Sequence, residues 1–149
     1  MSGEIVLAIR LGPSSTAPTT VAADLARSMG ARILVLYVAT EIAPVEVGGA
    51  EAGMGPGGEE EGILADAELA LRDFIATNLA GLPVSSRVVA GKVEECVADV
   101  ATELGARFIV VGTRGRSALA RLVLGDTVHG ILQRTPCPVV VVPLGDTGS

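Results

Sequence analysis

Three glycines at a fixed spacing form the pattern in this chain that points most directly to chemistry. Gly112, Gly115 and Gly125 give the pattern G-x2-G-x9-G. It follows an apolar run that predicts a buried strand, and it ends where a helix is predicted to begin. Glycine allows backbone N–H groups to approach a ligand closely, and the N-terminus of a helix attracts anions. The spacing matches neither the Walker A pattern nor G-x-G-x-x-G, and it predicts a phosphate-binding loop.

The charge around this loop favours an anion. Arg114 and Arg116 flank Gly115 and can form charge-assisted hydrogen bonds to phosphate, although both are equally suited to be solvated loop residues. From 107 to 134 the chain has five arginines and one acid, whereas 41–61 has six glutamates and no basic residue. The net charge of −6 argues against general binding to nucleic acid or to a membrane surface.

A second motif follows the glycines at 135–143, where the chain reads Thr-Pro-Cys-Pro-Val-Val-Val-Val-Pro. Together the two motifs resemble the universal stress protein family, which carries G-x2-G-x9-G-[ST] and then Pro-Cys-Pro-Val-x-Val-Val-Pro. The resemblance covers nearly the whole chain and is strongest from Phe108 to Pro143. It implies a cytoplasmic regulatory protein that binds an adenine nucleotide, ATP or AMP, and hydrolyses it slowly at most.

The resemblance also implies where the nucleotide binds. The loop glycines and the residues after the third glycine hold the phosphates in this family, and a glycine after the third strand lies near the nucleoside. Turn geometry would explain several of these glycines without any ligand. The implied binding residues are Ile9, Arg10, Val38, Gly91, Gly112, Arg114, Gly115, Arg116, Gly125, Asp126 and Thr127.

Asp126 departs from the family pattern, because it follows the third glycine where relatives that bind ATP carry Ser or Thr. A carboxylate only accepts hydrogen bonds at neutral pH and repels phosphate oxygens. Three interpretations stay open: Asp126 is the N-cap of the next helix, it holds a Mg²⁺ that bridges to phosphate, or Thr127 supplies the hydroxyl in a shifted register.

Arg10 is a second departure, since the family commonly has an aspartate at the end of the first strand. An arginine cannot accept a hydrogen bond from ribose or from the adenine amino group. It can stack on a base, contact a phosphate or pair with an acid. Arg10 and Asp126 therefore favour recognition of phosphate over recognition of adenosine. They also leave open a homologue that does not bind ATP and acts as a dimeric protein-interaction module.

The elements that must position these residues follow from composition and periodicity. The 149 residues predict one domain, and 49% hydrophobic with 2% aromatic residues predicts a core of aliphatic side chains. Such runs suit parallel strands buried on both faces. We expect a five-stranded parallel open sheet with helices on both faces, a Rossmann-like α/β fold similar to adenine nucleotide alpha hydrolases, with ligand at the carboxyl ends of the strands. The expected strands are 4–9, 32–38, 84–90, 107–111 and 138–142, and the expected helices are 20–29, 63–79, 93–104 and 127–134.

Two further segments carry expectations. Residues 47–62 are rich in Gly and Glu and lack periodicity, which predicts a flexible loop within the domain. Val139–Val142 is an uninterrupted apolar run, and an uncovered strand of this kind needs a partner. Because the family pairs its last strand across a twofold axis, the resemblance implies a homodimer through Val139–Val142.

No catalytic residue is predicted. Cys96 and Cys137 lie in separate apolar contexts, as expected for small buried residues in a reducing cytoplasm. His129 has no Ser or Cys partner at a recognisable spacing and is expected at the surface or an interface. No apolar run approaches the roughly 20 residues needed to span a bilayer.

Overall fold

The computed structural model describes residues 3–10, 15–39, 56–113 and 125–143. Within these ranges strands and helices alternate along the chain, as the sequence predicts. Their bounds in chain order are β1 (Glu4–Ile9), α1 (Thr16–Met29), β2 (Arg32–Ala39), α3 (Pro56–Asn78), β3 (Val84–Ala90), α4 (Val93–Leu104), β4 (Phe108–Thr113), α6 (Gly125–Arg134) and β5 (Val139–Pro143).

The strands form one parallel sheet in the order β3-β2-β1-β4-β5. The chain first builds outward from β1 to β3, and then returns to place β4 on the other side of β1. Residues far apart in sequence therefore pair in register, such as Ile5 with Phe108 and Leu7 with Val110. This reversal confirms the predicted parallel α/β architecture and places its switch point between β1 and β4.

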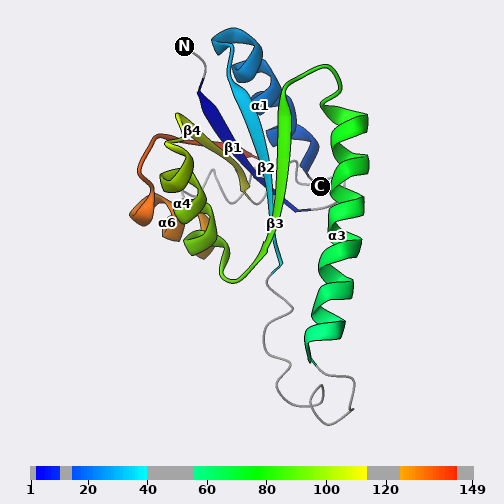
Figure 1. Ribbon diagram of the computed structural model, residues 1–149. Coiled ribbons are helices and arrows are strands. Elements are labelled where there is room, and N and C mark those ends of the chain that lie inside the picture. The colour runs from blue at the N-terminus through cyan, green and yellow to red at the C-terminus, as the bar shows by residue number, and fades with distance from the viewer. Residues whose placement is uncertain (1–2, 11–14, 40–55, 114–124, 144–149) are drawn as a thin grey trace.

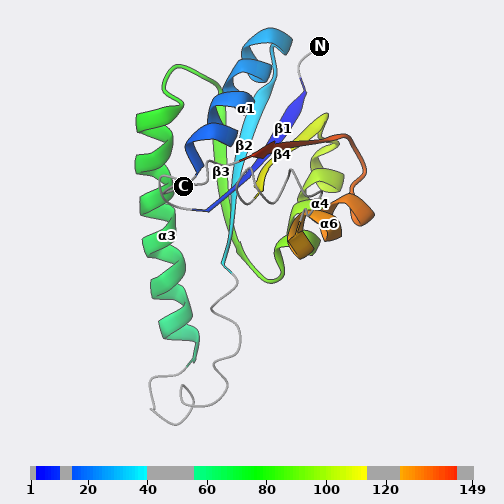
Figure 2. The ribbon, with the colours of Figure 1, turned by 180° about the vertical axis from the view of Figure 1, so that it is seen from behind.

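Helices cover both faces of the sheet, with α1 and α3 on one face and α4 and α6 on the other (Figures 1 and 2). Side chains alternate between these faces along each strand. In β1, Ile5 and Leu7 contact the core under α1 and α3, whereas Val6 contacts the core under α4 and α6. All three are fully buried, which explains why the strand sequence is continuously apolar rather than alternating.

Glycines follow the last residues of two of the helices. Gly30 follows α1 and Gly105 follows α4, with φ of 66° and 60°. In this left-handed conformation the N–H of Gly30 donates to the carbonyl of Ala26, and that of Gly105 donates to the carbonyl of Ala101. Each helix therefore stops at the amino edge of the sheet, and the chain enters the next strand directly.

Helix α3 begins earlier than expected. It starts at Pro56 rather than at residue 63, so residues 56–62 of the predicted loop are helical, and the rest of that loop lies outside the described residues. Proline suits the first position of a helix because its fixed φ is helical and no N–H is needed there. The 23-residue helix is about 35 Å long. Figure 1 shows its N-terminal end extending beyond the ends of the strands.

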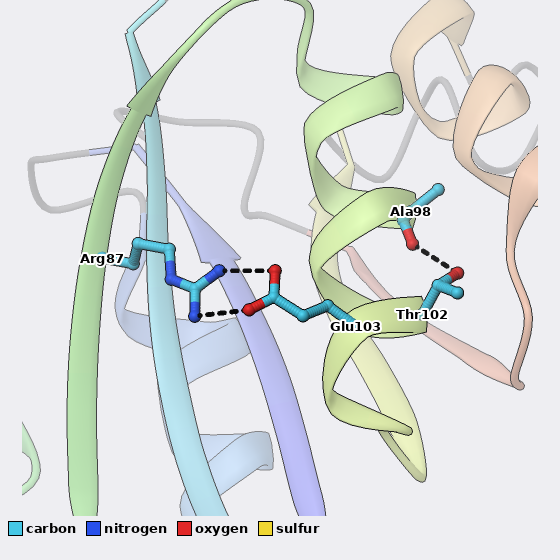
Figure 3. A network of polar contacts seen from close by, with 4 residues as sticks. All are labelled: Arg87, Ala98, Thr102 and Glu103. Carbon is cyan, nitrogen blue, oxygen red and sulfur yellow. Dashed lines mark hydrogen bonds and ion pairs between the residues drawn. The ribbon is translucent and has the colours of Figure 1, made fainter.

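The edge strand β3 is tied to α4 by an ion pair (Figure 3). The two guanidinium nitrogens of Arg87 donate to the two carboxylate oxygens of Glu103 at 3.1 and 3.3 Å. Beside it, the hydroxyl of Thr102 donates to the carbonyl of Ala98 at 2.9 Å. The side chains of the pair are 35% and 60% exposed, so solvent limits its contribution to stability to about 0–1 kcal/mol.

Burial of β4 predicts a large effect of core truncation. Ile109 is 0% exposed, so Ile109→Ala should lower the free energy of unfolding by about 2–5 kcal/mol through lost burial and a residual cavity. Leu69→Ala is the control, because Leu69 is 58% exposed and should change stability little. Urea denaturation followed by circular dichroism measures both. Equal effects of the two substitutions would contradict the burial of β4.

Candidate functional site

The described candidate residues come together at one edge of the sheet. Parallel strands have their carboxyl ends at the same edge, and this places Ile9, Val38, Gly91 and Gly112 along it. Helices α1, α4 and α6 begin at this edge, because each runs antiparallel to the strands it covers. The predicted residues 114–116 lie outside the described residues. The structure therefore places residues from five segments along this edge, and the switch point lies between β1 and β4.

Arg10 follows the last residue of the central strand. The pairing between β1 and β4 ends at Leu7 and Val110, three residues before Arg10. Ile9, the last residue of β1, faces the core under α1 and α3. The Arg10 side chain is exposed, and no acidic side chain among the described residues forms an ion pair with it. Of the alternatives for Arg10, pairing with an acid therefore has no support in the described part of the chain.

The backbone of Arg10 is held by the buried hydroxyl of Ser15. The N–H of Arg10 donates to Ser15 Oγ at 3.2 Å, and the same hydroxyl donates back to the carbonyl of Arg10. The hydroxyl of Thr19 donates to the carbonyl of Ser15 at 2.7 Å. Ser15 occupies the N-cap position of α1 but forms no side-chain bond to the helix. Its hydroxyl holds the backbone of Arg10, the residue after β1, instead of capping the helix.

Gly91 is required at the end of β3 for two reasons. Its φ is 147°, in the region that favours glycine, and its N–H donates to the carbonyl of Ala39 at 3.3 Å. A Cβ at this position would lie 3.0 Å from the sulfur of Cys96. The turn geometry predicted as an alternative explanation is thus present, and the sulfur of Cys96 occupies the space that a side chain at Gly91 would need.

Cys96 is a packing residue rather than a reactive thiol. Its sulfur lies 3.9 Å from the carbonyl oxygen of Ala90. Burial raises the pKa of the Cys96 thiol, and the carboxylates of Asp99, Glu95 and Glu94 raise it further. The thiol therefore stays protonated at neutral pH, as expected for an inert small residue.

The N-terminus of α6 contains the third glycine of the sequence pattern. Gly125 has φ of 85°, and a Cβ there would meet nothing within 4 Å among the described atoms. Backbone conformation, not crowding, requires glycine at this position. The prediction that Asp126 is the N-cap is wrong, because α6 begins at Gly125 and Asp126 lies inside its first turn. Asp126 and Thr127 are both exposed.

A close contact between α4 and α6 fixes the position of this N-terminus. A Cβ on Gly130 would lie 2.9 Å from both Cβ and Cγ of Glu94, so only glycine admits the Glu94 side chain at this separation. Sequence reasoning missed this contact. The available signal was a glycine in the middle of a predicted helix, which often marks close packing.

An open groove lies elsewhere, between α4 and α6, with a volume of about 380 Å³. It is lined by Glu95, Ala98, Asp99, Thr102 and Arg134, and it contains none of the predicted binding residues. Its two carboxylates belong to the solvent-facing side of α4. We therefore take the edge of the sheet, not this groove, as the candidate site.

Other sources of chemistry are scarce in the described part of the chain. The described residues contain no group of three or more potential metal ligands. Cys96 and Cys137 are free, and burial raises the pKa of Cys137 although the Thr135 hydroxyl opposes this. His129 is exposed on α6, as predicted. No helix among these residues has the length and apolar character to cross a membrane.

The chain aligns with only part of a longer relative. Universal stress protein Rv2005c of Mycobacterium tuberculosis is 26% identical over 140 residues, which are 92% of this chain and 44% of the relative. The chain thus spans less than half the length of this mycobacterial protein.

Solved structures share the fold. Universal stress protein UspA from Lactobacillus plantarum has a TM-score of 0.71 at 22% identity, covering 94% of this chain and 97% of that chain. A universal stress protein in complex with cAMP has a TM-score of 0.61 at 20% identity, covering 96% and 98%. The protein from Archaeoglobus fulgidus in complex with dAMP has a TM-score of 0.57 at 19% identity, covering 93% and 96%.

The model of the universal stress protein family matches residues 1–143, which is nearly the whole chain and includes both sequence motifs. The parallel sheet with its switch point beside β1 is the fold of the solved relatives. The chain belongs to the universal stress protein family.

Proposed function

We propose that this protein binds an adenine nucleotide at the carboxyl edge of its sheet and acts as a cytoplasmic regulatory protein. The observation that supports the proposal is that Arg10, Gly91, Gly112 and the N-terminus of α6 all lie along the carboxyl edge of the sheet, which has its switch point between β1 and β4. Open α/β sheets bind ligands at this location. Relatives solved with cAMP and dAMP support the same class of ligand.

Different parts of the edge suit different parts of a nucleotide. Val38 is apolar and nearly buried, with 8% of its surface exposed, and Gly91 has no side chain, so the end of the edge at β2 and β3 suits the nucleoside. At the other end, Arg10 and the N–H groups at the start of α6 suit phosphate. The predicted loop residues 114–116 would add donors there. Asp126 would hold Mg²⁺ if a bound nucleotide carries the metal.

A binding role fits this edge better than catalysis. General base catalysis requires a side chain positioned to accept a proton from water, and such a group is usually oriented by a partner. Among the described residues at this edge, the hydroxyls of Ser15 and Thr19 are engaged with backbone groups. We therefore assign signalling of nucleotide occupancy as the role, with slow hydrolysis at most.

Gly125→Ala tests the proposed site. A side chain is strained at φ of 85°, so the substitution should displace the start of α6 and weaken nucleotide binding at least about tenfold. Gly105→Ala is the matched control, because φ is 60° there but the residue ends α4 at the opposite edge. Titration calorimetry with AMP, ADP and ATP, with and without Mg²⁺, measures both variants. Equal losses in the two variants would contradict the assigned location.

The same titration decides between nucleotide binding and the second candidate function. Arg10 and Asp126 are the residues that favour a protein-interaction module, because they replace the groups expected to contact nucleoside and phosphate. If no nucleotide binds the unmodified protein at any tested concentration, nucleotide binding is wrong and the interaction module is favoured.

We also propose that the protein forms a homodimer through β5. This strand pairs only with β4 in the sheet order, and Val139–Val141 are partly exposed. The N–H of Ile109 donates to the carbonyl of Pro138, so alternation along a parallel ladder turns the backbone groups of Val139 and Val141 toward the open edge. A second β5 strand can use these groups, which would cover an apolar edge.

Val141→Pro should convert the dimer to a monomer. Proline removes one outward N–H, while proline on an edge strand leaves the ladder to β4 intact. Val141→Thr is the control, because it keeps both the N–H and the branched shape. Size-exclusion chromatography with light scattering gives the mass, and circular dichroism confirms folding. A folded Val141→Pro dimer would place the interface elsewhere.

A further inference from the structure

We propose that Glu94 is a positioning residue for nucleotide binding, because its side chain separates α4 from α6 and so sets the place of the α6 N-terminus. The inference rests on the proposed nucleotide site and adds a residue that acts on it without touching ligand. Helices α4 and α6 lie side by side on one face of the sheet (Figures 1 and 2). Glu94 contacts α6 at Gly130, about 7.5 Å along the helix axis from Gly125.

Space, and not backbone conformation, explains the glycine at position 130. Gly130 lies inside α6 and has no positive φ. Glycine in the middle of a helix is less favourable than alanine. The three atoms nearest to a Cβ at this position are Cβ, Cγ and Cδ of Glu94, at 2.9, 2.9 and 3.5 Å. The Glu94 side chain therefore determines how closely α6 approaches α4.

Helix α4 is the fixed side of this contact. Val97 and Ala101 are fully buried in the core under α4 and α6. The start of the helix is held as well, since a Cβ on Gly91 would lie only 3.0 Å from the sulfur of Cys96. Glu94 belongs to this first turn of α4, so its side chain acts as a spacer on a rigid base.

Helix α6 is the side that a change at this contact would move. Val128 and Ile131 are buried, whereas residues 125–127 at the start of the helix are exposed. Carbon atoms in contact lie about 3.5–4.0 Å apart, so a Cβ at position 130 would push α6 from Glu94 by roughly 0.6 Å or more. Groups that bind a ligand must be held to within about 0.5 Å. The Glu94 contact is thus close enough to control the N–H groups that we assign to phosphate.

Gly130→Ala should weaken binding of AMP and ATP by about tenfold or more, because it displaces the start of α6. Titration calorimetry of the full chain, with and without Mg²⁺, measures the affinity. Adding Glu94→Gly to Gly130→Ala should restore affinity, because all three nearest atoms are then removed. Adding Glu94→Ala should restore little, since the Cβ at 2.9 Å remains. Restoration by a second substitution is a result that a simple loss of stability would not give.

Two control substitutions separate the contact from charge and from helix propensity. Glu94→Gln keeps the carbon atoms and removes the charge, so it should not restore affinity to Gly130→Ala. Glu95→Gly places a glycine in the same turn, but Glu95 is exposed and supplies none of the three atoms nearest to position 130, so it should not restore affinity either. Thermal melting of each variant shows that it is folded at the temperature of the titration.

A variant without added bulk tests the spacer if Gly130→Ala is unfolded. Glu94→Ala in the otherwise unmodified protein removes Cγ and Cδ of the spacer and creates no clash. It should bind AMP and ATP less tightly than Glu94→Gln, which lacks the same charge but keeps the spacer.

The outcomes separate this proposal from the proposed function. Unchanged nucleotide affinity in folded Gly130→Ala, or equal affinities of Glu94→Ala and Glu94→Gln, would overturn the positioning role and leave nucleotide binding in place. Equal restoration by Glu94→Gly and Glu95→Gly would also overturn it, because the contact would then not be the cause. Failure of AMP and ATP to bind the unmodified protein would overturn both proposals.

Discussion

Burial of the central strand β1 on both faces and both edges constrains every other part of this protein. Its side chains Ile5, Val6 and Leu7 are fully buried, and its backbone pairs with β2 on one side and β4 on the other. A strand in this position leaves no polar group on its faces, so functional groups are displaced to its ends. The carboxyl end of β1, where the chain order reverses, is therefore where Arg10 becomes exposed while its backbone remains fixed.

The predictability of the fold follows from the same constraint. Continuous aliphatic runs identified β1, β2, β4 and β5, because burial on both faces leaves a local signal in the sequence, whereas the expected strand at 84–90 rested on alternation. Strand order left no such signal in one sequence, since β4 pairs with β1 through contacts between distant residues. The early start of α3 was not predicted, because the glycines at 57–62 have a low helix propensity and the segment resembles a loop, although Pro56 suits the first position of a helix.

The candidate site was predictable in its residues but less so in their roles. The glycine spacing located Gly125, and the structure shows that its φ is the reason for glycine. The roles of Asp126 and Ser15 were harder, because both residue types are common N-caps and the sequence does not show where a helix begins. Ser15 bonds to Arg10 instead, and Asp126 lies one position inside its helix. A shift of one residue in the start of α6 thus turns Asp126 from an N-cap into a negative charge in the first turn.

Helix α6 connects the candidate site to the free edge of the sheet. Its first residues contribute to the site, and a short turn after Arg134 leads into β5. Gly130 lets the middle of α6 pack against Glu94 of α4. A Cβ on Gly130 would lie 2.9 Å from the Glu94 side chain, so the two helices could not pack this closely with a larger residue there. The two edge strands of the sheet differ in their contacts to the helices. An ion pair between Arg87 and Glu103 joins β3 to α4, whereas the described residues contain no ion pair that joins β5 to a helix. Helix α6 thus runs from the candidate site to the turn before β5, the edge at which we propose that two copies pair.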